Sequence, residues 1–313
     1  MAQIEPVPAS HRARAIRFIA GGSAVQPGRD ARLDGLEVLA GGDHRQRVRL
    51  WWARQGRCVA AAMVVEHPGQ SGFLIHCPPE APGVQRGALV AVVRAVSEDA
   101  LKAGLHFVQA TLPPEDKAGA DTVRAGGYEF IAELVYMRLN LPRPSQPRHP
   151  RDLRLQSYDQ FTDKQLGELI AATYEDSLDC PLLLRARPIA GVIAGHKATG
   201  LFHPQSWWIV YQEEMAAGCI LLNDQPAGRN GEVVYVGVHP RHRGKGLGRW
   251  LLRHAVADGR RRGLRSFSLA VDGRNDPAKR LYARCGFRET HRREVYAMIK
   301  ARASGERARR AGC

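Results

Sequence analysis

Apolar residues in the second half of the chain follow helical and strand-like patterns in turn. Apolar positions three or four residues apart predict helices over 162–173 and 247–261. A proline at the start of 277–284 predicts a third helix. Runs rich in β-branched and aromatic residues predict strands at 207–212, 216–222, 232–238, 266–271 and 294–299. The pattern predicts a mixed α/β domain whose first two strands form a hairpin turning at Glu213-Glu214.

The first half of the chain repeats features of the second half. Two tryptophan pairs, Trp51-Trp52 and Trp207-Trp208, stand 156 residues apart, and the segments 59–65 and 215–221 that follow them are alike. Further matches then recur at a spacing of 159 or 160: Gly104-Leu105 with Gly263-Leu264, Gly127-Tyr128 with Gly286-Phe287, and Tyr136 with Tyr296. Matches in one order at a nearly constant spacing predict a tandem duplication of one domain.

Proline and charge patterns suggest where the copies begin and end. The stretch LPRPSQPRHPRD at 141–152 is too rich in proline to propagate a helix or a central strand. We therefore predict a domain over 1–141, an extended linker over 142–152 and a second domain over 153–300. The basic segment 301–313 lacks apolar periodicity and is expected to be a solvated tail.

Composition excludes several classes of protein. The 313 residues are 44% hydrophobic and 25% charged, which is typical of a folded domain rather than a disordered chain. No apolar run is long enough for a membrane span, and the N-terminus lacks the apolar region of a secretory signal. Six scattered cysteines without a CxxC pair argue against zinc and against a disulfide framework. We expect reduced thiols, no metal, no membrane association and a cytoplasmic location.

The formal net charge of +15 fits either nucleic acid or an anionic small molecule. Nine basic residues and one acid lie between 241 and 265, beside the glycine-rich turn described next. Because neither an aromatic-rich RNA motif nor zinc-finger spacing is present, a nucleic-acid partner is not expected.

A glycine-rich turn separates the strand 232–238 from the helix 247–261 and reads Arg243-Gly244-Lys245-Gly246-Leu247-Gly248. The start of a helix carries unpaired N–H groups and partial positive charge, both of which attract phosphate. Gly246 and Gly248 lack a Cβ atom, so an anion can approach the backbone closely, and Arg243 and Lys245 add formal charge. The spacing does not fit the Rossmann fingerprint, and the P-loop motif is absent.

Two motifs together resemble one family. The strand end followed by Arg243-x-x-Gly246-x-Gly248 is similar to the acyl-CoA pyrophosphate loop of the GNAT superfamily of N-acetyltransferases. The segment NDPAKRLYARCGF at 275–287 resembles that family's closing N-x-x-A-x-x-x-Y-x-x-x-G-F motif. The resemblance is strong over 215–300 and weaker over 152–215, and the duplicated arrangement resembles mycothiol synthase and other double-GNAT proteins. It implies an α/β fold of two tandem GNAT-like domains, each a mixed, mostly antiparallel sheet flanked by helices.

The resemblance also implies an activity. Members of the family transfer an acetyl group from acetyl-CoA to an amine that attacks the thioester directly. The residues that would contact acetyl-CoA are Val236, Val238, Arg243, Gly244, Lys245, Gly246, Leu247, Gly248, Asn275 and Lys279. The backbone N–H of Val238 would stabilise the oxyanion, and Tyr282 would protonate the departing thiolate. Two structural alternatives stay open: Tyr282 as a core aromatic residue and Asn275 as a helix cap.

The general base is less well defined by the sequence. Glu232 is the leading candidate, with Tyr235 on the same strand; strict alternation would place the two on opposite faces unless the strand bulges. Other titratable or nucleophilic residues lie near the expected acceptor segment or the phosphate loop, where a solvated or structural role is the alternative. These are Glu175, Asp176, Asp179, Cys180, His196, His203, His239 and His242.

The first copy has lost the residues that carry the resemblance. At a spacing of 159, Tyr282 matches Val123 and Asn275 matches Asp116, while the loop residues match Val84, Gly87 and Leu89. A valine cannot protonate a thiolate, so we predict that domain 1–141 is degenerate and domain 153–300 catalytic. Two alternatives remain: mycothiol-synthase-like acetylation of an aminothiol conjugate, and a non-catalytic protein that binds acyl-CoA or nucleic acid. The sequence leaves the amine acceptor and the oligomeric state open.

Overall fold

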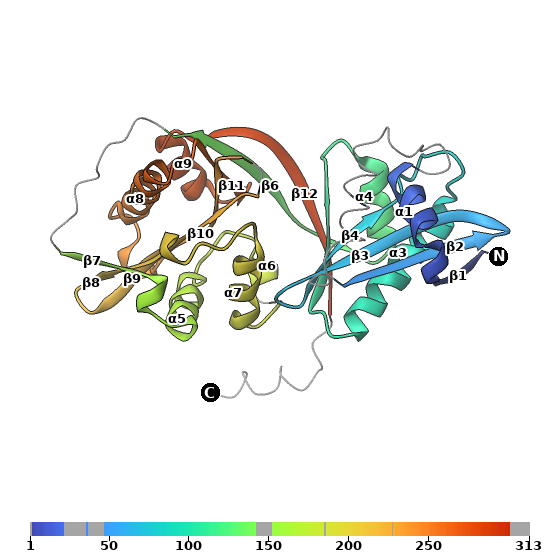
Figure 1. Cartoon of the computed structure of the whole chain (residues 1–313), viewed down its shortest axis with the longest axis horizontal. Helices are drawn as coiled ribbons and strands as arrows, with labels where there is room; N and C mark the ends of the chain where they lie inside the picture. The colour runs from blue at the N-terminus through green and yellow to red at the C-terminus, as the bar shows by residue number, and fades with distance from the viewer. Residues whose placement is uncertain are drawn as a thin grey trace. The chain divides into compact units, whose positions relative to one another are not determined.

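The computed structural model describes residues 2–21, 36, 47–141, 152–184, 186–226 and 228–300. Residue contacts divide the chain into two units (Figure 1). Unit 1 holds the described residues of 1–130 and 295–300, and unit 2 holds those of 131–294. The predicted linker, apart from Asp152, and the predicted tail 301–313 lie outside the described residues.

Unit 2 is built on a sheet with the strand order β7-β8-β9-β10-β11-β6. Its strands are β7 (Leu153–Ser157), β8 (Trp207–Gln212), β9 (Met215–Asp224), β10 (Asn230–Val238), β11 (Ser266–Asp272) and β6 (Glu129–Asn140). Neighbouring strands pair antiparallel, except for the parallel pair β10–β11. The predicted hairpin is present as β8 and β9, with Glu213 in a left-handed conformation at its turn.

Helices cover both faces of this sheet (Figure 1). They are α5 (Asp163–Thr173), α6 (Pro181–Leu184), α7 (Ile189–Ala198), α8 (Leu247–Arg261) and α9 (Asp276–Arg284). Leu251 and Leu252 of α8 pack with Phe267 on one face, whereas Leu166 and Ile170 of α5 pack on the other. The predicted bounds 247–261 match those of α8, because its apolar stripe begins directly after Gly246.

Unit 1 has the strand order β1-β2-β3-β4-β5, again antiparallel except for its last pair, β4–β5. Its strands are β1 (Gln3–Pro6), β2 (Val48–Gln55), β3 (Arg57–His67), β4 (Ser71–His76) and β5 (Phe107–Leu112). Its helices are α1 (Arg12–Gly21), α3 (Arg86–Lys102) and α4 (Lys117–Ala125). Trp52, Met63 and Leu89 are among the fully buried side chains of its core.

The two units repeat one another in detail. Asp116 caps α4 by accepting a hydrogen bond from the Gly119 N–H, as Asn275 caps α9 by accepting one from Ala278. Gly127 and Gly286, which follow these two helices, both have positive φ, 100° and 94°. Equivalent residues thus take the same backbone conformation at the predicted spacing of 159. The predicted fold, two tandem α/β domains with mixed and mostly antiparallel sheets, is confirmed.

The last strand of each repeat passes into the other contact unit, β6 for most of its length and β12 (Arg288–Ile299) for its final part. β6 follows α4 in the chain, yet its residues 134–140 pair with β11 in unit 2. β12 follows α9, yet its residues from 295 onward belong to unit 1, where Tyr296 is fully buried. Arg124 of unit 1 donates a hydrogen bond to the Tyr296 hydroxyl at 2.9 Å. The division into a degenerate domain 1–141 and a catalytic domain 153–300 therefore stays a prediction about function.

Two further properties concern the described ranges alone. No helix in these ranges is long and apolar enough to cross a membrane. The five cysteines that the structure describes are free thiols: Cys58, Cys77, Cys180, Cys219 and Cys285.

Candidate active site

An irregularity in β10 opens the sheet of unit 2. The register between β10 and β9 shifts between Val233 and Tyr235, which places a β-bulge at Val234. On its other side β10 pairs with β11 only from Asn230↔Ser266 to Glu232↔Ser268. Because a bulge bends a strand and increases its twist, the two strands part beyond this last pair. A cavity of 240 Å³ occupies the opening.

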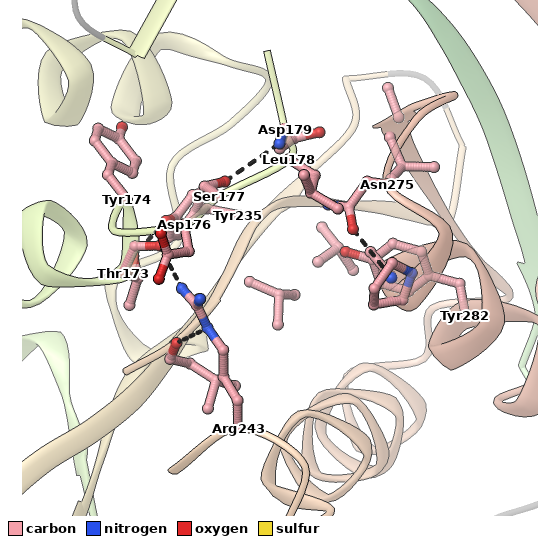
Figure 2. Close-up of a pocket in the computed structure, with 18 of the residues that line it drawn as sticks. Thr173, Tyr174, Asp176, Ser177, Leu178, Asp179, Tyr235, Arg243, Asn275 and Tyr282 are labelled. Carbon is pink, nitrogen blue, oxygen red and sulfur yellow. Dashed lines mark hydrogen bonds between the residues drawn. The ribbon is translucent and has the colours of Figure 1, made fainter. Parts of the chain in front are cut away.

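The cavity is bounded by four parts of unit 2 (Figure 2). They are residues 233–238 of β10, Ala270 and Val271 of β11, the end of α5 with the loop that follows it, and α9 with Asn275 before it; Arg243 of the glycine-rich turn completes the lining. Of the predicted site residues, Val236, Val238, Arg243, Asn275 and Tyr282 line it. The sheet opening, a helix end and a loop thus meet at one place.

The hydrogen-bond pattern of β10 leaves two backbone N–H groups facing the opening. The His239 N–H donates to the Ala217 carbonyl of β9 at 2.9 Å. Antiparallel strands alternate between residues that bond to the partner and residues that point away, so Gly237 and Tyr235 bond to β9. Val236 and Val238 then direct their N–H groups towards β11, which does not pair with them in the described structure. These groups are available to a molecule in the cavity.

The glycine-rich turn exposes the start of α8. Gly246 is the N-cap residue at φ 82°, no side chain caps the helix, and Gly244 has φ 78°. A Cβ at either glycine would meet no atom within 4 Å, so the space above the first N–H groups is open. Leu247 is buried in the core, which leaves only its backbone for binding.

Gly248 also has a role in packing. A Cβ at this position would lie 3.0 Å from Leu281 Cδ2 of α9. The missing side chain therefore allows α8 and α9 to pack closely, and the predicted contact of Gly248 with the donor stays a prediction.

Arg243 and Lys279 make hydrogen bonds or ion pairs within the protein, whereas Lys245 is open to solvent. The Arg243 guanidinium donates to the Val238 carbonyl at 3.1 Å and to the Thr173 and Glu175 carbonyls at 3.0 and 2.8 Å, so it ties the turn to the end of α5 (Figure 2). Lys245 is exposed. Lys279 pairs with Asp276 at 2.8 Å and is not among the residues that line the cavity.

Tyr282 is 8% exposed and lines the cavity, with its ring 5.8 Å from that of Phe287. Burial raises the pKa of its phenol well above the ordinary value, and the charge of Asp179 adds to this effect. The phenol is therefore neutral and carries its proton at physiological pH. Asn275 caps α9 and also lines the cavity, so the predicted cap is present.

Glu232 lies at the closed end of the opening, in the last residue pair that joins β10 to β11. It is not among the residues that line the cavity. Burial raises the pKa of its carboxyl, and a hydrogen bond from Gln225 partly offsets this. Tyr235 does line the cavity, and its hydroxyl lies 2.6 Å from Thr173 Oγ1. Strict alternation would place Glu232 and Tyr235 on opposite faces of β10. The β-bulge lies between these two residues and breaks the alternation.

A reciprocal pair of hydrogen bonds fixes the loop after α5, which the sequence did not reveal. The Asp272 N–H donates to Asp179 Oδ1, and the Cys180 N–H donates to Asp272 Oδ2, both at 3.0 Å. Burial raises the pKa of the Asp179 carboxyl and of the Cys180 thiol, and nearby acidic groups add to both effects. Cys180 is therefore a neutral thiol, as expected of a residue that is not a nucleophile.

The other candidate bases have structural surroundings. Burial, with the charge of Arg187 adding, lowers the pKa of His196 to about 3, so the ring is neutral. His239 accepts a hydrogen bond from the Arg241 N–H, and His242 bonds to Gln212 at 2.9 Å. His203 lines a different cavity. In the acceptor segment, Asp176 and Asp179 line the cavity, whereas Glu175 is exposed and outside it.

We expect Asp272→Asn to destabilise the fold at neutral pH. Asp272 is fully buried; burial opposes its charge, but hydrogen bonds from Arg274 and Cys180 outweigh burial and lower its pKa. Arg274 is half-exposed and keeps its hydrogen bond to the Ile131 carbonyl, so the cost, about 1–3 kcal/mol, comes mainly from the weakened hydrogen bonds to the buried side chain of residue 272. Because the folded pKa is depressed, this stabilisation is present above the unfolded pKa and is lost as the pH falls through the folded value.

Thermal unfolding of the wild type and the variant from neutral to acidic pH measures this difference. The gap in Tm should be largest near neutral pH and shrink on acidification. Asp276→Asn, which removes an exposed carboxylate from the same segment, is the matched control and should change Tm little. A gap that stays constant with pH would contradict the assignment of the effect to the Asp272 charge.

Unit 1 shares the short parallel pairing, since β4 pairs with β5 only from Ser71↔Phe107 to Phe73↔Gln109, but in its described residues it lacks other features of the site. The register between β3 and β4 runs unbroken from Ala62↔His76 to His67↔Ser71, so there is no bulge in the described strand. Gly87 lies inside α3, whose N-cap is Gln85 at φ −102°, and Val123 is fully buried at the position equivalent to Tyr282. These differences support the prediction that the first repeat is degenerate.

Residues 168–287 match the profile of the Acetyltransferase (GNAT) family. A mycothiol acetyltransferase from Pseudarthrobacter chlorophenolicus is 28% identical over 259 residues, 76% of this chain and 74% of the relative. A mycothiol acetyltransferase from Propionibacterium freudenreichii subsp. shermanii is also 28% identical, over 51% of this chain, and the alignment spans about half of that relative, 52%.

A solved structure extends the similarity to the whole fold. A tandem GNAT protein from the clavulanic acid biosynthesis pathway superposes with a TM-score of 0.55, covering 97% of this chain and all of that one, 100%. At 16% sequence identity this likeness concerns the fold alone. The chain therefore resembles the GNAT acetyltransferases over residues 168–287, is similar to mycothiol acetyltransferases over a larger part of its length, and has the fold of a tandem GNAT protein.

Proposed function

We propose that unit 2 binds acetyl-CoA in the opening between β10 and β11 and transfers the acetyl group to an amine by direct attack. The observation that carries this proposal is the bulged opening itself. Two unpaired N–H groups of β10 face it, Tyr282 lines it, and Glu232 stands where it closes. We propose unit 1 as a supporting, non-catalytic repeat.

The donor would be held mainly by backbone groups. Its pyrophosphate would accept hydrogen bonds from the first N–H groups of α8, where the helix dipole and Lys245 add positive charge. Its pantetheine arm would lie along β10, with Val236 providing strand-like hydrogen bonds. Arg243 would act indirectly, because its guanidinium holds the turn against α5. Lys279 points to Asp276 instead, so we assign it to the support of α9 rather than to the donor.

The chemistry needs a base, an oxyanion donor and an acid. Glu232 would take a proton from the incoming ammonium group, and its raised pKa makes it a better acceptor near neutral pH. The free amine then attacks the thioester carbon, and the Val238 N–H stabilises the oxyanion. As the carbon–sulfur bond breaks, the phenol of Tyr282 gives its proton to the departing thiolate, whose conjugate thiol has a solution pKa of about 8.5. The protonated nitrogen of the new amide loses its extra proton, which restores the phenol of Tyr282, and Glu232 releases the proton it took from the ammonium group to solvent. The products are an amide and CoA.

Tyr282→Phe is the direct test of this proposal. We expect kcat for acetyl transfer to fall about 10²-fold, since the phenylalanine fills the same space without a proton to give. CoA release from acetyl-CoA with a panel of primary amines measures the rate, and calorimetry measures donor binding, which should not change. Tyr235→Phe removes another cavity hydroxyl and is the control. Unchanged kcat in Tyr282→Phe would exclude the acid role.

A second candidate narrows the acceptor to an aminothiol conjugate, as in mycothiol synthesis. The similarity to two mycothiol acetyltransferases favours it. Acetylation of an aminothiol conjugate with a higher kcat/KM than simple amines would support it. A cytoplasmic location, independence from metal ions and the absence of a nucleic-acid partner stay predictions.

A further inference from the structure

Three polar side chains form a row across the sheet of unit 2, next to the opening. Glu232 of β10 is paired with Ser268 of β11, which is paired with Arg138 of β6. Residues paired across neighbouring strands project on the same side of a sheet. Their neighbours Phe267 and Leu139 pack on the α8 face, so the row lies on the opposite face. A carboxylate, a hydroxyl and a guanidinium thus stand side by side.

A second cavity, of 420 Å³, adjoins this row. Five of its six lining residues carry polar side chains: Arg138, Gln225, Pro226, Asn230, Ser266 and Ser268, with Pro226 the exception. Arg138 Nη2 donates to Ser266 Oγ at 3.0 Å, and Ser266 Oγ donates to Asn230 Oδ1 at 2.6 Å. Gln225 joins this cavity to the candidate base, because its amide donates to the Glu232 carboxylate. The cavity and the base are therefore parts of one polar surface.

The charge of Arg138 is not neutralised in the described part of the chain. Arg138 is exposed, and its one hydrogen bond there goes to a neutral hydroxyl. The nearby Tyr136 pairs with Ala270, stacks on His291, and has a pKa that burial and the Glu232 charge raise while Arg293 lowers it. Within the row, Glu232 therefore supplies the negative charge and Arg138 the positive charge.

Neighbouring strands are about 4.8 Å apart, so the Glu232 and Arg138 backbones are about 10 Å apart. One small molecule can reach both side chains. A guanidinium binds a carboxylate or phosphate through charge-assisted hydrogen bonds, which are stronger and more directional than neutral ones.

We propose that the acceptor carries an anionic group in addition to its amine, and that Arg138 binds this group while Glu232 receives the amine proton. The proposal rests on the proposed function, since it takes Glu232 as the base. It assigns Arg138 to acceptor specificity and leaves donor binding to α8 and β10. The shared chemistry is a carboxylate or a phosphate, and the acceptors used in the test distinguish the two.

The test compares amines that differ by the anionic group alone. Suitable pairs are γ-aminobutyrate with butylamine, phenylalanine with phenethylamine, and phosphoethanolamine with ethanolamine. At saturating acetyl-CoA, we expect the wild type to prefer the anionic member of at least one pair about tenfold or more in kcat/KM. Arg138→Gln should lower kcat/KM for that anionic amine about tenfold and leave its neutral partner unchanged. Comparing wild type and variant on the same acceptor cancels differences in amine pKa.

Arg261→Gln is the matched control, because Arg261 is an exposed arginine of α8 that is paired with Asp258. It should not change the preference. Equal loss for both members of a pair in Arg138→Gln would indicate a structural role and overturn the proposal. Faster turnover of neutral amines, including a neutral aminothiol conjugate, would overturn it while the proposed function stands. Failure of acetyl-CoA to bind, or of every amine to be acetylated, would sink the proposed function and this proposal with it.

Discussion

Glu232→Gln is expected to lower kcat for acetyl transfer by about 10²–10⁴-fold, because glutamine keeps the shape of glutamate but cannot accept a proton. The substitution should leave the fold intact, since the Gln225 amide that now donates to the carboxylate can donate equally to an amide oxygen. Glu232 is not among the residues that line the donor cavity, so the Kd for acetyl-CoA should stay unchanged.

The pH profile separates this role from a structural one. Burial raises the pKa of Glu232, and the base must be unprotonated to act. Wild-type kcat/KM should therefore rise with pH, and the midpoint of this rising limb should lie above the ordinary pKa range of a glutamate. That limb should disappear in Glu232→Gln. Glu175→Gln, which alters an exposed carboxylate of the loop after α5, is the control and should keep it. Persistence of the limb in Glu232→Gln would assign the base to another residue.

Local rules were enough to predict much of the catalytic repeat from its sequence. The bounds of α8 follow from Gly246, because only glycine readily takes its φ of 82° at a helix start. The cap of α9 follows from Asn275 and Pro277, which fit the first turn of a helix. Tyr282 could be placed because the motif fixes its spacing from these caps.

Other features depend on contacts that no local pattern encodes. The hydrogen bonds between Asp272 and the loop after α5 join residues 92 and 93 positions apart. The side chain of Arg243 was expected to serve an anion, but backbone carbonyls at the end of α5 satisfy it. The row of Glu232, Ser268 and Arg138 needs the pairing of β6 with β11, which a division at residue 141 would not suggest.

The exchange of last strands explains why the sequence division and the contact division differ. A strand is stabilised by whichever sheet edge it pairs with, and chain order does not decide between two similar edges. Since β6 completes the sheet of unit 2, residues from the first repeat contribute to the surface beside the candidate base. A truncated chain beginning after residue 141 would lack Arg138, so activity assays need the full chain.

Gly246→Trp is expected to weaken acetyl-CoA binding by more than about 100-fold, because the indole would occupy the space through which a phosphate reaches the first N–H groups of α8. No atom lies within 4 Å of the position of the new Cβ, so the substitution meets no clash within the protein. The left-handed conformation of the residue adds about 1–2 kcal/mol of strain for any side chain. Loss of binding must therefore be distinguished from loss of the helix.

Gly263→Trp separates the two effects. Gly263 follows the other end of the same helix at φ 81° and also has no atom within 4 Å, so it carries the same strain away from the proposed phosphate site. Calorimetric titration of acetyl-CoA at fixed salt should give one site in the wild type and in Gly263→Trp, and none in Gly246→Trp. Gly87→Trp changes the equivalent position of the first repeat, and unaltered binding there would support the view that this repeat is degenerate. A second wild-type site that Gly87→Trp removes would show instead that both repeats hold acetyl-CoA, because a helix start can bind phosphate without the tyrosine that catalysis requires.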